Sequence, residues 1–132
     1  MKTLFVNVEH DSEGFTLYTE NEIFSGIGDS LDEARASLEE SIRLYVEIMK
    51  EDKKQFPQYL DGNYEIKYKM DVSEALEIYE GLIGLTALEK LTGISKKQLW
   101  TYRNGTKPQQ AQIKKLQEGL NRLGRELSAI SF

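Results

Sequence analysis

The sequence predicts an α+β protein, with a small sheet-and-helix domain at residues 1–70 and an all-helical domain at residues 71–132. Alternating apolar and polar residues, the pattern of half-buried strands, are confined to the first 70 residues. The charge divides at the same place. Residues 1–70 carry 8 Lys or Arg and 15 Asp or Glu, a net charge of −7, whereas residues 71–132 carry 9 and 7, a net charge of +2. We therefore expect the two domains to meet different partners.

Three strands are predicted before the first long helix. Apolar residues recur at every second position over 4–8, which places them on one buried face of a strand. Turn residues over 10–14 lead into a return strand over 15–19, and a third short strand is predicted around 23–27. His10 falls in the predicted turn, where we expect a solvated side chain rather than a catalytic or metal-binding one.

The long helix of the first domain should begin at Ser30. Ser30 and Glu33 form the S-x-x-E pattern of a capping box, in which each side chain binds a backbone N–H of the first turn. Residues 50–63 mix charges with Pro and Gly and predict an exposed loop, and alternation over 64–70 predicts a fourth strand. The order is therefore βββαβ. One stripe of the helix would cover the sheet with Ala34, Leu38, Ile42, Tyr45 and Met49.

The second domain is predicted to contain helices only. Asp71 and Thr86 are the predicted N-caps of two short helices that Gly84 separates. Another helix is predicted over 95–104. Pro108 suits the first turn of a long final helix, because its ring fixes a backbone angle that the helix already needs.

The two helices on either side of Gly93 have the features of a helix-turn-helix. Gly93 relieves the tight turn, Ile94 fills the gap between the helices, and Ser95 caps the second helix, which ends at Gly105 in a left-handed conformation. On a helical wheel, one face of the second helix points to the core. The opposite face gathers Lys96, Lys97, Trp100, Thr101 and Asn104.

This second helix lies in the most basic part of the chain. Residues 86–125 hold 9 Lys or Arg and 2 Glu, a net charge of +7, and nucleic acid is the default partner of such a segment. Leu99 and Tyr102 would face the core, so the opposite face would enter the major groove. Lys, Thr and Trp side chains there can contact bases, phosphate or sugar. The predicted DNA-binding residues are Ser95, Lys96, Lys97, Gln98, Trp100, Thr101, Arg103, Asn104 and Lys107.

The run ALEKLTGISKKQLWTYRNGTKP resembles the helix-turn-helix of phage-repressor and Cro-type transcription regulators, over residues 75–125. In that family the first residues of the second helix read bases, and Lys96, Lys97 and Thr101 occupy those positions here. The resemblance implies a transcriptional repressor. Two alternatives stay open: Trp100 belongs to the core, or the whole surface binds a protein rather than DNA.

The final helix predicts a homodimer. Its apolar residues step by 3, 4, 3, 4 and 3, which is a seam with a seven-residue period. Part of the seam must pack on its own domain, and the tail GRELSAISF can join a second copy. That pairing would supply the twofold symmetry that half-sites about 34 Å apart require. Packing within one chain and higher oligomers remain open. The seam consists of Ile113, Leu116, Leu120, Leu123, Leu127 and Ile130.

The whole chain resembles the HicB family of antitoxins. The resemblance lies in the order βββαβ followed by a helix-turn-helix, and in the segment GDSLDEA, where Gly28, Ser30, Glu33 and Ala34 match the family's G-x-[ST]-x-x-E-A pattern. It implies a degenerate RNase H-like domain that occludes a small basic HicA-like ribonuclease toxin, and a second domain that binds operator DNA. The family's P-x-L-P-G-C stretch between the second and third strands is absent, and residues 21–27 are shorter there.

Two functions other than toxin binding are possible for the first domain. The domain could dimerise or sense a ligand in a stand-alone repressor. It could also be a nuclease, but RNase H-type chemistry needs converging carboxylates around Mg²⁺. We expect no enzyme, metal or cofactor, because the acids lie mainly in predicted turns and a cap: Glu9, Asp11, Glu13, Asp29, Asp32 and Glu33.

Composition limits the remaining classes. There are no cysteines, which excludes disulfides and thiolate metal sites. The sequence has no apolar run of about 18 residues, and its start, MKTLFVNVEH, lacks the features of a secretory peptide. We therefore expect a cytoplasmic protein with no membrane partner.

Overall fold

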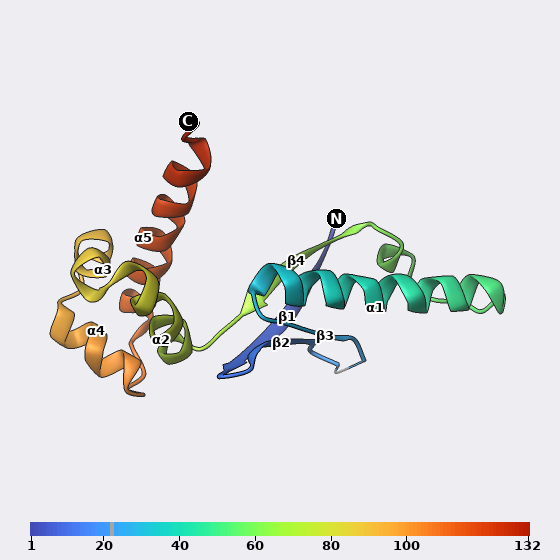
Figure 1. Cartoon of the computed structure of the whole chain (residues 1–132), viewed down its shortest axis with the longest axis horizontal. Helices are drawn as coiled ribbons and strands as arrows, with labels where there is room; N and C mark the ends of the chain where they lie inside the picture. The colour runs from blue at the N-terminus through green and yellow to red at the C-terminus, as the bar shows by residue number, and fades with distance from the viewer. Residues whose placement is uncertain (22) are drawn as a thin grey trace. The chain divides into compact units, whose positions relative to one another are not determined.

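The computed structural model describes residues 1–21 and 23–132, and residue 22, within the short predicted connection, lies outside them (Figure 1). The α+β class is confirmed, since the described residues form a four-stranded mixed sheet and five α-helices. The chain divides into two compact units, Met1–Met70 and Asp71–Phe132. The elements are β1 (Lys2–Asp11), β2 (Gly14–Thr19), β3 (Ser25–Gly28), α1 (Leu31–Glu51), the 3-10 helix η1 (Gln58–Leu60), β4 (Tyr64–Lys69), α2 (Val72–Ile83), α3 (Leu85–Thr92), α4 (Lys96–Arg103) and α5 (Gln110–Ala129).

The sheet of the first unit has the strand order β3-β2-β1-β4. β1 pairs antiparallel with β2 and parallel with β4, so Val6 lies opposite Thr19 on one side and Tyr68 on the other. The predicted turn over 10–14 is too long. His10 belongs to β1 and lies opposite Phe15, and their ring centroids are 4.6 Å apart. The β1–β2 pairing thus continues to Asp11 and Gly14, and the turn consists of residues 12 and 13 only.

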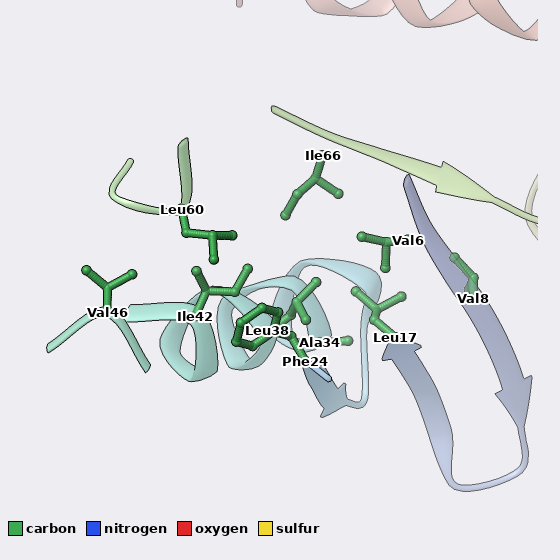
Figure 2. Packing of buried hydrophobic residues seen from close by; sticks show 10 residues of the cluster. All are labelled: Val6, Val8, Leu17, Phe24, Ala34, Leu38, Ile42, Val46, Leu60 and Ile66. Carbon is green, nitrogen blue, oxygen red and sulfur yellow. The ribbon is translucent and has the colours of Figure 1, made fainter. Parts of the chain in front are cut away.

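α1 covers one face of this sheet (Figure 2). The predicted stripe is correct for Ala34, Leu38 and Ile42, which are buried, and Val46 occupies the next place on it. The predicted Tyr45 and Met49 are only half-buried. The loop predicted over 50–63 is wrong in two respects, because α1 continues to Glu51 and η1 buries a leucine in the core. Figure 2 shows that leucine, Leu60, beside Ile42.

The start of α1 has half of the predicted capping box. Ser30 Oγ accepts a hydrogen bond from Glu33 N at 3.1 Å, as predicted. The Glu33 carboxylate instead accepts from Asp29 N at 3.0 Å, and Asp29 lies before the first turn of α1. Both bonds fix the chain where it leaves β3 for α1.

The second unit packs α2, α3, α4 and α5 around one core. Two predicted helix starts are wrong. α3 begins at Leu85, and Gly84 is its N-cap in place of Thr86; the Gly84 carbonyl accepts from Leu88 N at 3.1 Å. α5 begins at Gln110, beyond Pro108. The core residues are Leu76, Leu88, Ile94, Leu99, Tyr102 and Leu116.

The apolar seam of α5 changes its surroundings along the helix. Leu116 is buried in the unit's core and Leu120 packs against it. Leu127 and Ile130 are 58% and 53% exposed. Figure 1 shows the C-terminal end of α5 extending beyond α3. The first part of the seam therefore packs within the chain, and the last part does not.

Candidate nucleic-acid interface

A short, well-bonded turn joins α3 to α4. Gly93 forms the predicted tight turn in a left-handed conformation, with φ 75°, and its N–H donates to the Glu89 carbonyl at 2.8 Å. Ile94 is buried between the helices, as predicted, and its N–H donates to Thr92 Oγ1 at 3.1 Å. Each of these two turn N–H groups has a partner, so the angle between the helices is held by both packing and hydrogen bonds.

The first turn of α4 is held by two side chains. Ser95 Oγ accepts from Gln98 N at 3.2 Å, the predicted N-cap bond. Lys96 N donates to Glu89 Oε2 at 2.8 Å. The Glu89 bond was not predicted, because it depends on how the turn folds back on α3 and no local sequence pattern encodes that path.

α4 has one buried and one exposed face. Leu99 and Tyr102 are buried, as predicted. Trp100 is 55% exposed, so the alternative that placed it in the core is wrong. The other side chains exposed on α4 are Lys96, Lys97 and Gln98, with Asn104 just beyond its end.

Two predicted site residues use their polar groups within the helix. Thr101 is half-buried, and its Oγ1 donates to the Lys97 carbonyl at 2.9 Å. Asn104 Nδ2 donates to the Trp100 carbonyl at 2.8 Å. Both bonds are of the ordinary kind within one helical turn, and each side chain keeps acceptor capacity.

Arg103 and Lys107 differ in their surroundings. The half-buried Arg103 forms an ion pair with Glu80, which ties the end of α4 to α2. Its contact with DNA stays a prediction. Lys107 is exposed in the connection between α4 and α5. The structure thus brings the lysines and Trp100 together on α4, while Lys107 lies beyond it.

Ion pairs on α1 neutralise part of the negative charge of the acidic unit. Arg43 pairs with both Glu40 and Glu47, and its hydrogen bond lowers the pKa of the Glu40 carboxyl. These are exposed pairs within one helix, which contribute little to stability. An open pocket of about 450 Å³ lies in this unit, with Lys2 and Tyr59 among its lining residues.

Two of the acids considered for a nuclease form local hydrogen bonds. Glu9 accepts from Tyr18 Oη at 3.1 Å, and Asp11 Oδ1 accepts from Glu13 N at 2.8 Å. Over residues 1–21 and 23–132, no group of three or more His, Cys, Asp or Glu side chains is arranged to hold a metal ion.

The exposed groups on α4 can donate hydrogen bonds, neutralise phosphate and stack on an apolar surface. None of the helices in the described ranges is both long enough and apolar enough to cross a membrane. A comparison of the chain with protein-family models, curated proteins and solved structures finds no match.

Proposed function

We propose that the Asp71–Phe132 unit binds duplex DNA as a helix-turn-helix repressor, with α4 in the major groove. The observation that carries this proposal is the exposed face of α4, where Lys96, Lys97 and Trp100 stand opposite the buried Leu99 and Tyr102. An α-helix fits the major groove, and lysine and indole groups can contact guanine acceptors and thymine methyls there. The turn that fixes α4 on α3 makes this face rigid.

Phosphate contacts would supply most of the affinity. The segment over 86–125 has a net charge of +7, and Lys107, Lys114 and Lys115 are exposed beyond α4. Lysine contacts of this kind release counterions from DNA, so binding should weaken steeply with salt. They would set affinity, whereas α4 would set sequence preference.

The repressor would act as a homodimer. Leu127 and Ile130 extend the α5 seam past the core of the unit and are exposed. A seven-residue apolar repeat pairs well with a second helix of the same kind. Two copies joined there would present two α4 helices to a palindromic operator.

For the Met1–Met70 unit we propose the antitoxin role. It would be a degenerate RNase H-like domain that binds and occludes a small basic ribonuclease of the HicA kind in the cytoplasm. Its net charge of −7 complements a basic partner, and the segment over residues 28–34 carries the resemblance to HicB antitoxins. The whole chain would then neutralise the toxin and repress its own operon.

A stand-alone repressor with a ligand-sensing first unit is the second candidate. The open pocket of about 450 Å³ favours it, since its lining mixes aromatic rings such as Tyr45 and Tyr59 with polar side chains. Copurification from the native host followed by mass spectrometry separates the two candidates. A small basic protein encoded beside this chain would support the antitoxin, and a bound small molecule without any protein partner would support the sensor.

The DNA proposal is tested with Lys97→Glu. The duplex is one that the protein itself selects from a random library, and affinity is measured by gel shift at moderate salt. Reversing a charge on the exposed face of α4 should weaken binding by at least about 100-fold, since a good base contact alone contributes about 1–3 kcal/mol. The single Trp100 gives a second readout, because its emission should change when DNA covers it.

The matched control is Lys90→Glu, which reverses an exposed lysine of α3 outside the predicted interface. It should weaken binding much less than Lys97→Glu. Circular dichroism should show both variants folded, and pairing with any toxin should persist. Unchanged affinity in Lys97→Glu would refute the assignment of α4 as the recognition helix.

A further inference from the structure

Glu89 is an acidic residue within the most basic part of the chain, residues 86–125. Of the two acids within residues 86–125, Glu118 is exposed on α5, whereas Glu89 is half-buried beside the start of α4. A negative charge in this place opposes DNA binding, so its presence needs another physical reason. Its hydrogen bonds indicate that reason.

Glu89 receives hydrogen bonds from both ends of the turn. Its carbonyl accepts from Gly93 N at 2.8 Å, where the turn begins. Its carboxylate Oε2 accepts from Lys96 N at 2.8 Å, where α4 begins. The residue on α3 therefore fixes the entry point of α4 directly, with a charge-assisted bond in addition to the packing of Ile94.

The carboxylate also changes the electrostatics at the start of α4. A helix N-terminus attracts anions, and an open one would bind a DNA phosphate whatever the base sequence. At α4 the Lys96 N–H is already taken by Glu89. The negative charge of Glu89 would also repel phosphates that approach this end of the helix.

We propose that Glu89 is a positioning and specificity-determining residue for DNA recognition. It holds the first turn of α4 at the angle that base contacts require, and its charge suppresses sequence-independent binding to phosphate. This inference rests on the proposed DNA-binding function. Glu89 would raise the ratio between the affinity for a selected sequence and the affinity for random duplex.

The experiment compares Glu89→Gln with Glu118→Gln. Each change removes one negative charge from the same basic segment, and Glu89 is the acid that accepts the hydrogen bond from Lys96 N at the start of α4. A glutamine keeps an oxygen acceptor for Lys96 N, so the turn should stay in place. Affinities for a selected duplex and for random duplex are measured by fluorescence anisotropy over a series of NaCl concentrations.

For Glu89→Gln, the affinity for random duplex should rise about three- to tenfold, with a steeper salt dependence. The ratio of selected to random binding should fall by a similar factor. Glu118→Gln should change both affinities equally and leave the ratio as in wild type. A ratio that is the same in the two variants would overturn the specificity role.

The positioning role is tested with Glu89→Ala, which removes the bond to Lys96 N as well as the charge. Its affinity for the selected duplex should fall about tenfold below that of Glu89→Gln, in proportion to one lost hydrogen bond. Equal affinities in these two variants would overturn the positioning role. Thermal unfolding monitors the fold. If Glu89→Ala unfolds, hydrogen exchange at Lys96 N in the wild-type protein decides the positioning role: slow exchange supports the bond to Glu89, and exchange as fast as that of an open amide refutes it.

The failure of this inference is distinct from failure of the proposed function. If the wild-type protein selects no sequence from the library and binds random duplex no better than Lys97→Glu does, DNA binding itself is wrong and the role of Glu89 falls with it. If the wild type binds selectively and the Glu89 variants behave as Glu118→Gln does, only the role of Glu89 is wrong.

Discussion

Gly119 and Gly124 occupy the same helix but meet different surroundings. A Cβ atom built on Gly119 would lie 2.7 Å from the Leu91 carbonyl oxygen, because α5 crosses the end of α3 there. A Cβ atom on Gly124 would meet nothing within 4 Å. The absence of a side chain therefore has a packing role at Gly119 only.

Replacing the two glycines by alanine should change stability in opposite directions. Gly119→Ala should lower the free energy of unfolding by about 1–3 kcal/mol, because the backbone of α3 must move away. Gly124→Ala should raise it by up to about 1 kcal/mol, since alanine favours a helix. Urea denaturation followed by circular dichroism measures both. A Gly119→Ala protein as stable as Gly124→Ala would show that α3 and α5 are not held this closely.

Residues whose roles are set by their immediate neighbours in the chain were predictable. Gly93, Ser95 and Leu99 follow from turn conformation, capping and helical period, and the structure confirms all three. The bond from Lys96 N to Glu89 and the ion pair of Arg103 were missed. They join residues of different helices, and their geometry exists only once the helices have packed.

Among whole elements, helix and strand identity was easier to predict than their ends. The period of apolar residues identified α1 and β4, but the start of α3 and the start of α5 were misplaced at Thr86 and Pro108. Judged by residue type alone, Thr86 and Pro108 both favour the N-terminus of a helix. The structure begins α3 earlier, where Gly84 with its positive φ allows the sharp break after α2, and α5 later, after Gln109 in an extended conformation.

The exposed end of α5 provides a test of the proposed dimer. Leu127→Asp places a charge on the seam, and Ser128→Asp places the same charge on the neighbouring residue outside it. Leu127→Asp should shift the mass measured by analytical ultracentrifugation toward the monomer, because a buried charge in a helix pair is costly. Ser128→Asp should remain a dimer. The proposal is wrong if the wild-type protein is monomeric at micromolar concentration.

For the whole molecule, the change of composition at residue 70 coincides with the division into two compact units. Each unit has its own apolar core, and the described core residues of one do not belong to the other. Charge and strand alternation made that boundary visible in the sequence. The partners of the two units are a separate matter, since the same folds can serve different functions.

Separate cores predict separate folding. A fragment of residues 71–132 should keep its helical circular dichroism and bind the selected duplex within about tenfold of the full chain, because the phosphate and base contacts proposed above all lie in it. A fragment of residues 1–70 should fold without binding DNA. Loss of helical structure in the isolated 71–132 fragment would contradict the independence of the units.

The parallel pairing of β1 with β4 has a consequence for the newborn chain. β1 leaves the ribosome long before β4 is translated. Until then, the N–H and C=O groups on this edge of β1 have no partner strand. Only when residues 64–69 emerge can the sheet close. Chains truncated before residue 64 would keep this edge of β1 unpaired and would tend to aggregate, so a cell would need to degrade them quickly.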